Sequence, residues 1–389
     1  MKRSTRLLHL GRKAHVQPGL VNLPVARAST VTFDSMAHMR EVQKRFDAGE
    51  PVPTYGITNM PLRVAFEELM VEIEGGHRAT TYPSGLAAVA AAIMAAVQAG
   101  DHILVTDACY GPTRMFCDRT LKRFGVATDY YDPTIGADIE RLMKPNTRAV
   151  YLESPGSLTF EVQDFPAIAQ AAHAKGAAVI HDNTWATGLN FRSFDHGADL
   201  VIQAATKYPA GHSDVLIGAV VANEKWWPRL KETTRDLGQT ASPDDLWLTL
   251  RGLRTLDLRL REQSANALFI AEALQGHAAI ARVLHPALED HPQHALWKRD
   301  FLGATGLFGI ELRPAPREKV ERFVESLELF TLGYSWGGFE SLVTLADLDR
   351  YGRSVVPWTG GPVVRLQIGL EDPQDLLDDL RQALAQIAT

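Results

Sequence analysis

Between about residues 60 and 225, segments with helical periodicity alternate with short apolar segments that have the length of buried strands. The apolar side chains of residues 62–73 recur at helical spacing, and Gly75 and Gly76 end that segment. Strands are predicted at residues 102–106, 148–153, 177–182, 199–204 and 216–221. Because strands that alternate with helices pair in the same direction, this pattern predicts an α/β fold with a mostly parallel sheet covered on both faces.

Further helices are predicted between these strands. One opens at Ser84 and ends near Gly100, and another spans residues 113–124. A third starts after Asp164, which is a suitable N-cap, with Pro166 in its first turn.

After residue 225 the pattern changes. Residues 242–274 predict one long connecting helix, with the charged residues 257–262 on its solvent-facing side. Short strands such as residues 307–312 then predict a smaller α+β domain, whereas the first 55 residues have weak periodicity and predict an extended arm. The expected division is an arm at residues 1–57, a large domain at residues 58–250 and a C-terminal domain at residues 251–389.

Composition narrows the class of protein. The chain of 389 residues is 46% hydrophobic and 22% charged, which is typical of a packed globular protein. Its net charge of −6 argues against a nucleic-acid partner. No apolar run approaches the roughly 20 residues of a membrane span. A soluble enzyme or binding protein in the cytoplasm, without a membrane or nucleic-acid partner, is expected.

Cysteine use and the N-terminus agree with this expectation. Cys109 and Cys117 form no CxxC pair, and no Cys/His cluster has metal-site spacing, so no metal is expected. Two free thiols in a reducing compartment are the expectation, with a disulfide left open. The basic N-terminus lacks the apolar core of a secretory signal and is expected to belong to the folded protein, with a transit peptide as the alternative.

Polar residues at the carboxyl ends of the predicted strands mark the candidate site, because ligands of open parallel sheets bind there. Asp182 ends one strand, Lys207 follows another, Tyr110 follows a third, and Ser84 and Gly85 start a helix. A lysine, an acid, an aromatic ring and a helix N-terminus suit pyridoxal 5′-phosphate (PLP). That cofactor needs a Schiff-base lysine, a carboxylate at its pyridine nitrogen and a cradle for its phosphate.

Six segments in order carry a resemblance to a known family. They are Tyr82-Pro-Ser-Gly-Leu-Ala-Ala, Glu153-Ser-Pro-Gly-Ser, Asp182-Asn-Thr-Trp-Ala, Gln203-Ala-Ala-Thr-Lys-Tyr, Gly211-His-Ser-Asp and Tyr334-Ser-Trp-Gly-Gly-Phe-Glu-Ser. With them the chain resembles the Cys/Met-metabolism family of PLP enzymes over nearly its whole length. Within that family, it is most similar to the bacterial branch that cleaves cystathionine by β-elimination. The resemblance implies the PLP-dependent transferase fold of type I, with a mostly parallel seven-stranded sheet in the large domain and a smaller α+β C-terminal domain.

The resemblance also implies roles for individual residues. Lys207 is expected to hold PLP and to move the proton of the substrate α-carbon. Asp182 is expected to pair with the pyridine nitrogen, and Tyr110 to stack on the ring and assist proton transfer. The phosphate is expected at Ser84, Gly85, Leu86 and Thr206.

The substrate is expected to meet a second set of residues. Arg365 is expected to bind the α-carboxylate through two parallel hydrogen bonds, which lysine cannot form. Ser335 is expected near the lysine or the carboxylate, and Trp336 beside Arg365. His181 and His212 lie near the motifs and are interpreted as structural.

One departure from the family pattern concerns the arm. Relatives carry Tyr-x-Arg, which contacts the cofactor phosphate of the neighbouring subunit, whereas here Tyr55 is followed two positions later by Ile57. Thr58, Asn59 or Arg63 are candidates to compensate. PLP is still expected to bind, because Lys207, Asp182 and the helix N-terminus remain. Tyr55 is expected at the neighbour's cofactor and substrate, which implies a dimer, and the family usually forms a dimer of two such dimers.

The expected reaction is a β-elimination in which cystathionine reacts with water and gives homocysteine, pyruvate and ammonia. The alternatives are a β-lyase for other cysteine S-conjugates, a γ-lyase or γ-synthase of the same family, and a PLP-binding regulatory protein with vestigial catalysis. A nucleotide-binding protein is disfavoured, because neither a GxGxxG segment after a strand nor a GxxxxGK[ST] loop occurs.

Overall fold

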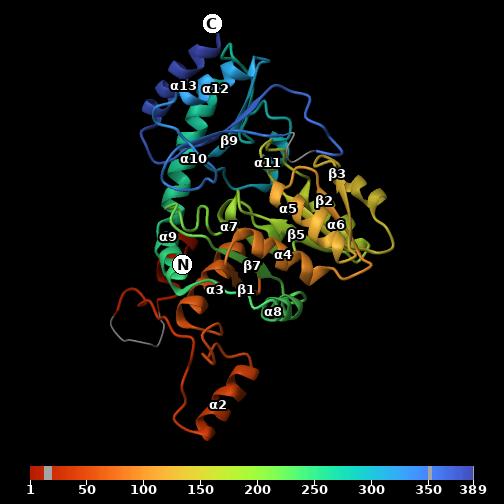
Figure 1. Cartoon of the computed structure of the whole chain (residues 1–389), viewed down its shortest axis with the longest axis vertical. Helices are drawn as coiled ribbons and strands as arrows, with labels where there is room; N and C mark the ends of the chain where they lie inside the picture. Colours follow the sequence, from red (N-terminus) through yellow and green to blue (C-terminus); the bar gives the residue numbers. More distant parts are fainter. Residues whose placement is uncertain (13–19, 349–352, 389) are drawn as a thin grey trace.

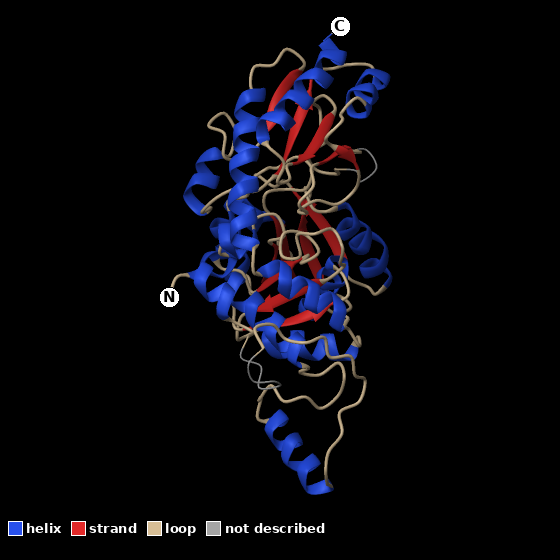
Figure 2. Ribbon diagram, turned by 90° about the vertical axis from the view of Figure 1, so that its left-hand side faces the viewer, coloured by secondary structure: helices blue, strands red, loops and turns tan. Residues whose placement is uncertain are grey.

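The computed structural model describes residues 1–12, 20–348 and 353–388. Two sheets follow each other along the long axis of the molecule. The N-terminal segment with its second helix projects from the end of the molecule that lies opposite the C-terminus (Figures 1 and 2). The first sheet has the strand order β1-β7-β6-β5-β4-β2-β3. Its strands are β1 (Arg78–Tyr82), β2 (His102–Thr106), β3 (Ala127–Tyr131), β4 (Thr147–Glu153), β5 (Ala178–Asp182), β6 (Leu200–Gln203) and β7 (Gly218–Ala222).

This first sheet confirms the predicted α/β class and the mostly parallel seven-stranded sheet. Strands β3, β2, β4, β5 and β6 pair in parallel, and only β7 is antiparallel to its neighbours β1 and β6. Alternate residues of β2 enter different cores: Ile103 and Val105 pack with α4 (Gly85–Ala96), whereas Leu104 packs with α6 (Phe165–Ala174). Helices therefore cover both faces, as the continuous apolar character of the strands requires.

The second sheet has the order β10-β11-β12-β9-β8 and is mostly antiparallel. Its strands are β8 (Ile280–Leu284), β9 (Leu307–Leu312), β10 (Thr331–Leu332), β11 (Leu342–Leu345) and β12 (Val363–Gln367). Helices α12 (Arg317–Glu325) and α13 (Pro373–Ala388) pack with it. This is the expected smaller α+β part of the chain, whereas the bounds of the three expected domains stay predictions.

The remaining helical segments connect these layers. They are α1 (Arg3–His9), α2 (Met36–Asp47), α3 (Pro61–Glu74), α5 (Gly111–Met115), η1 (Phe116–Leu121), η2 (Gly136–Leu142), α7 (Thr187–Asn190), η3 (Ser193–His196), α8 (Trp227–Asp236), α9 (Pro243–Leu253), α10 (Leu256–Leu274) and α11 (His294–Asp300). None of the helices within the described ranges is long and apolar enough to span a bilayer.

Two helix predictions need correction. The segment predicted as one helix at 113–124 begins at Gly111 and changes to a π-helical turn over η1. The connecting helix predicted at 242–274 is two helices, because the helical backbone is interrupted at Arg254 and Thr255. At that break, Arg254 Nη1 donates to the carbonyls of Leu7 and Leu10, at 2.6 and 2.8 Å.

Three further details also differ from prediction. Asp164 precedes α6, but its side chain caps no helix N–H and instead accepts a 2.8 Å hydrogen bond from Arg299. Arg259, predicted on a solvent-facing side, is only 5% exposed and bonds to the Gly252 carbonyl. The predicted extended arm contains two helices, and Leu7 of α1 is buried against α3, which accords with the N-terminus being part of the fold.

Candidate functional site

The side chains of Lys207, Ser335 and Arg365 meet where the two sheets face each other. Lys207 follows β6, and its Nζ donates to Ser335 Oγ at 2.5 Å. Arg365 lies on β12, and its Nη2 donates to the Ser335 carbonyl at 2.9 Å. The structure thus brings together the predicted cofactor lysine and the predicted carboxylate clamp, which the chain separates widely.

Lys207 is half-buried, and this changes its proton affinity. Burial and, after it, the charge of Arg365 lower the pKa of Lys207 to about 8, although the charge of Asp182 acts in the opposite direction. Near neutral pH the uncharged amine, which a nucleophile or a base requires, is therefore more populated than in a solvent-exposed lysine.

Asp182 ends β5 and is 8% exposed. Its Oδ1 accepts from the Thr184 amide at 3.0 Å and from the Thr184 hydroxyl, and Tyr151 donates to Oδ2 at 3.2 Å. Burial raises the pKa of Asp182, while these hydrogen bonds and Lys207 favour the charged form. The carboxylate is fixed in direction, which suits a partner for a ring nitrogen.

A second carboxyl group, Glu153, was missed as a site residue. It ends β4, is paired in register with Asp182, and accepts a 2.7 Å hydrogen bond from the Tyr110 amide. Burial, with the nearby charge of Asp182, raises the pKa of Glu153 well above its ordinary value. Its place as the last residue of a strand beside Asp182 is the sequence signal that could have found it. Tyr110 itself is 46% exposed.

The predicted phosphate cradle lies at the start of α4. Ser84 is the N-cap and accepts from the Ala87 amide at 3.1 Å. Gly85 and Leu86 occupy the first helical positions, whose N–H groups have no partner within a helix. A Cβ on Gly85 would lie 2.6 Å from that of Ala204, which is in the segment between β6 and Lys207. The close approach of α4 to this segment, residues 204–207, therefore requires glycine at position 85.

Two predicted site residues also make contacts within the fold. The Thr206 hydroxyl donates to the Ile217 carbonyl at 3.1 Å and accepts from the Ile217 amide at 2.9 Å, so it is already used within the fold. Trp336, expected beside Arg365, packs on Tyr208 with 5.4 Å between the ring centroids. The Lys207 ammonium lies 5.2 Å from the Trp336 ring, so this indole borders the lysine.

The two histidines near the motifs have structural partners. His181 is buried and its Nδ1 lies 2.8 Å from Ser193 Oγ; burial lowers the pKa of His181 to about 3, so the ring is neutral. His212 Nδ1 bonds to the Ala210 carbonyl at 2.7 Å. Cys109 and Cys117 are both buried and form no disulfide, as expected.

The arm residues stand apart from Lys207. Tyr55 is 54% exposed, and Ile57 borders a cavity of about 670 Å³ between the arm and α3, whose lining does not include Lys207. Arg63 contacts Glu67 and Thr80, at 2.7 and 2.9 Å, as well as the Ile57 carbonyl, so its guanidinium is engaged within its own chain. Asn59 donates to the Val52 carbonyl at 3.3 Å.

The residues that meet beside the sheet fit PLP. A half-buried lysine of lowered pKa suits an aldehyde, a buried and oriented carboxylate suits a pyridine nitrogen, and the first amides of α4 suit a phosphate. Fold and site together define a PLP-dependent enzyme.

Comparison with known proteins gives the family. The sequence pattern described as Cys/Met metabolism PLP-dependent enzyme matches residues 4–385. The chain belongs to this family, which confirms both the expected resemblance and the cofactor.

Individual relatives agree with this placement. The chain is 48% identical over 386 residues to a putative cystathionine beta-lyase of Rhizobium johnstonii, covering 98% of this chain and 96% of that protein. It is 41% identical over 393 residues to the cystathionine beta-lyase MetC of Escherichia coli, covering 99% of each. The crystal structure of cystathionine gamma synthase from Xanthomonas oryzae superposes with a TM-score of 0.90 at 33% identity, over 99% of this chain and 98% of that one.

Proposed function

We propose that this protein is a PLP-dependent carbon–sulfur β-lyase that converts cystathionine and water to homocysteine, pyruvate and ammonia. The observation that carries the proposal is the meeting of Lys207, Ser335 and Arg365, since it places a base and a carboxylate clamp together across the two sheets. The names of the two relatives at 48% and 41% identity support cystathionine as the substrate.

Each residue has a task in this reaction. Bound PLP supplies an electron-accepting ring that stabilises negative charge at the substrate α-carbon. Arg365 binds the substrate α-carboxylate, and the uncharged Nζ of Lys207 removes the α-proton. Asp182 orients the ring through its nitrogen, and Ser335 holds the free Nζ of Lys207 in place while it acts as the base.

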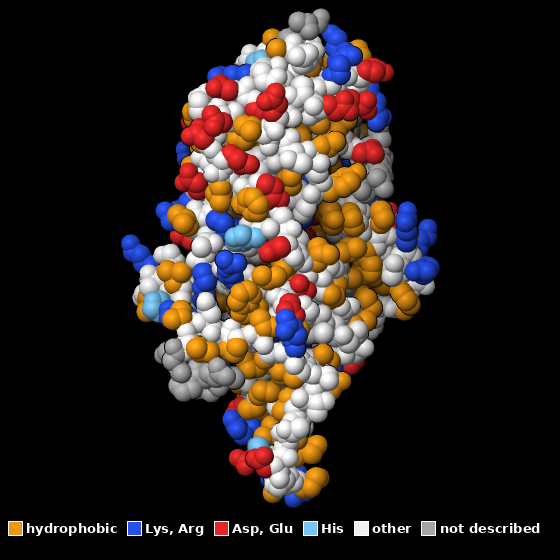
Figure 3. Space-filling model, turned by 60° about the vertical axis from the view of Figure 1, so that its left-hand side comes forward, with side chains coloured by type: hydrophobic (Ala, Val, Ile, Leu, Met, Phe, Trp, Pro, Cys, Tyr) orange, Lys and Arg blue, Asp and Glu red, His pale blue; other side chains and the backbone are white. Residues whose placement is uncertain are grey.

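The site is completed by a second copy of the chain in this proposal. Hydrophobic side chains gather on the projecting lower part of the molecule (Figure 3). Met36 and Met39 of α2 are exposed, and so are Tyr55 and Ile57. Burying such a surface favours association. Tyr55 then reaches the neighbour's cofactor and substrate, and two such dimers form a tetramer in the cytoplasm.

The test is product analysis. Purified holoenzyme is given cystathionine, and pyruvate and 2-oxobutyrate are measured separately. Pyruvate with homocysteine is the expected result. If 2-oxobutyrate forms with cysteine instead, the enzyme is a γ-lyase and the proposal fails, although the fold and cofactor stand.

The γ-acting branch is the second candidate, favoured by the close superposition on cystathionine gamma synthase. A matched assay with S-methylcysteine and methionine separates the two, because the first substrate has only a β-leaving group and the second only a γ-leaving group. Faster release of keto acid from S-methylcysteine supports β-elimination. If keto acid is released faster from S-methylcysteine but cystathionine is not turned over, the enzyme is a β-lyase for other cysteine S-conjugates.

A further inference from the structure

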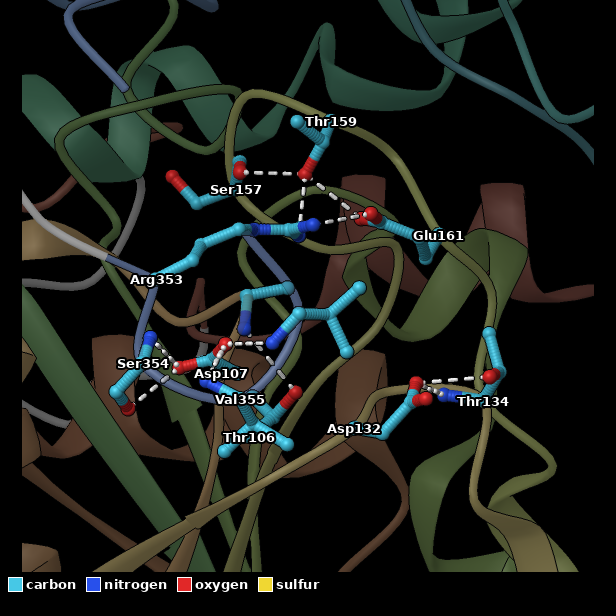
Figure 4. Close-up of polar contacts among 12 residues, drawn as sticks. Thr106, Asp107, Asp132, Thr134, Ser157, Thr159, Glu161, Arg353, Ser354 and Val355 are labelled. Carbon is cyan, nitrogen blue, oxygen red and sulfur yellow. Dashed lines mark hydrogen bonds and ion pairs between the residues drawn. The ribbon is translucent and has the colours of Figure 1, made fainter. Parts of the chain in front are cut away.

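Asp107 lies directly after β2 and is 2% exposed, yet it binds a distant segment of the chain. Its Oδ1 accepts from Ser354, from the amide at 3.0 Å and the hydroxyl at 3.1 Å, although the two residues are 247 positions apart. Its Oδ2 accepts from the amides of Val355 and Val356, each at 2.9 Å. Figure 4 shows this carboxylate beside Ser354 and Val355, with dashed lines for the hydrogen bonds between them.

The charge of Asp107 is also paired. Arg114 Nη2 donates to Oδ1 at 2.6 Å, and the guanidinium lies 3.7 Å from the Tyr130 ring centroid. Burial alone would raise the pKa of Asp107, but the backbone N–H groups and Arg114 bring it below its ordinary value. The group therefore stays a carboxylate with five hydrogen bonds, which is close to the capacity of its two oxygens.

The start of the same segment has a second anchor. Arg353 contacts Glu161 at 2.8 Å and Thr159 at 2.7 Å, and Thr159 also donates to Glu161 at 2.7 Å (Figure 4). The loop carrying Thr159 joins the loop after β2 as well, because the Ser157 amide donates to the Ala108 carbonyl at 2.8 Å. Both anchors thus attach residues 353–356 to the loops that follow β2 and β4.

These two loops and this segment lead directly to the site. Tyr110 lies on the loop after β2, and its amide is held by Glu153 at the end of β4. The segment 353–356 runs into β12, which carries Arg365. Asp107 therefore joins the part of the chain that carries the ring-stacking tyrosine to the part that carries the carboxylate clamp.

We propose that Asp107 is a positioning residue for substrate binding, which sets the distance between Arg365 on the second sheet and Tyr110 on the first. The inference rests on the proposed function for the roles of these two residues. Asp107 does not reach the reacting atoms; it acts through residues 353–356 on one side and through the short link to Tyr110 on the other.

Asp107→Asn is the variant of choice, since it keeps the shape of the side chain. The amide has one accepting oxygen, and its NH2 group faces hydrogen-bond donors, so at least two of the five donors lose their acceptor in either orientation of the amide. Asp379→Asn is the matched control. Asp379 is 7% exposed and accepts from the amides of Glu328 and Leu329, each at 2.9 Å, within the second-sheet part of the chain.

Two readouts are taken on the holoenzymes. Hydrogen–deuterium exchange of the amides at 353–356 is expected to accelerate at least tenfold in Asp107→Asn and to be unchanged in Asp379→Asn. Glycine, an amino acid without a leaving group, is titrated by the change in cofactor absorbance. Its dissociation constant is expected to rise about tenfold or more in Asp107→Asn only, and KM for cystathionine is expected to rise with it while kcat stays within about threefold.

The outcomes are distinguishable from those of the proposed function. Unchanged glycine binding together with faster hydrogen–deuterium exchange at 353–356 overturns the inference, because the hydrogen bonds of Asp107 would then have a structural role only. Glycine binding does not depend on which keto acid is released, so a γ-lyase result leaves this test intact. If Asp107→Asn does not fold, Arg353→Ala, which removes only the second anchor, is expected to weaken glycine binding two- to fivefold, and no change there also overturns the inference.

Discussion

Lys207 and Ser335 are 128 positions apart, but the lysine amine donates its hydrogen bond to the serine hydroxyl. The contact depends on a bent backbone: Ser335 has φ +76°, which costs a non-glycine residue energy, and a Cβ on Gly337 would lie 3.1 Å from the Lys207 Cα. The segment after β10 is therefore packed closely against the backbone of Lys207. The Lys207 amine is oriented by this contact before any ligand binds.

The first prediction concerns the amine itself. Lys207→Ala is expected to reduce turnover by more than a hundredfold, since a positioned general base contributes about 10²–10⁴-fold. Pyruvate release and exchange of the substrate α-proton in deuterated water are measured together. Lys175→Ala is the control, because Lys175 pairs with Glu140 on the surface at 2.9 Å. A Lys207→Ala enzyme that keeps more than about a hundredth of the wild-type rate contradicts the assignment of the base.

The second prediction concerns pH. The pKa of Lys207 is lowered to about 8 from 10.5 by burial and then by Arg365. The rate of PLP incorporation into apoenzyme is therefore expected to rise with pH through about 8. Arg365→Gln removes one cause of the lowering, so the pKa of Lys207 rises and the midpoint moves to higher pH.

Stopped-flow absorbance at a series of pH values measures this midpoint. Arg261→Gln is the control, since Arg261 is exposed and paired with Asp257 at 3.3 Å. A midpoint that is the same in wild type and Arg365→Gln would show that Arg365 does not act on the amine.

Much of the fold could be predicted because the period of the apolar residues reports it directly. Residues 102–106 and 307–312 are strands with the predicted bounds, as their short, mainly apolar sequences indicate. The break between α9 and α10 could not be predicted, because it depends on Arg254 reaching carbonyls of α1 and the residue after it. Burial of Arg259 has a similar cause: its acceptor is the carbonyl of Gly252, in the preceding helix.

The site was predictable where a residue follows a strand of the first sheet. Asp182 and Lys207 both do so, and parallel strands bring such ends together. The contact of Lys207 with Ser335 was foreseen only through the family resemblance, since the two residues follow strands of different sheets. The hydrogen bonds of Asp107 could not be predicted from the sequence around it, because its partners are backbone amides of an irregular segment far along the chain.

The third prediction concerns the departure at Ile57. Ile57→Arg restores the Tyr-x-Arg pattern in the arm, and the added guanidinium is expected to bind the phosphate of the neighbour's PLP. The dissociation constant of PLP is expected to fall about three- to tenfold at low salt, measured by fluorescence titration of the apoenzyme, since a phosphate contact of this kind adds roughly 1 kcal/mol. Ile57→Gln is the uncharged control. Equal affinities for Ile57→Arg and Ile57→Gln would mean that the arm does not reach a phosphate.

The last prediction starts from Glu74, a fully buried carboxylate at the end of α3. It accepts from the side chains of Asn183 and Gln203, at 2.8 and 3.0 Å, and from the Gly188 amide at 2.9 Å. It therefore connects the residue after Asp182 with the end of β6, the strand that precedes Lys207. Burial raises the pKa of Glu74 to about 7 from 4.5, and the three hydrogen bonds oppose this rise.

A raised pKa in the folded state makes stability depend on pH in a defined direction. The folded protein binds the Glu74 proton more tightly than the unfolded chain, so this contribution to stability is complete below pH 4.5 and is lost as pH rises through about 7. Glu74→Gln carries no such proton. The free energy of unfolding of wild type relative to Glu74→Gln is therefore expected to fall between pH 5 and pH 8 by on the order of 2–3 kcal/mol. Urea denaturation of the two holoenzymes at both pH values measures the difference, and a difference that does not change with pH would show that Glu74 is ionised throughout this range.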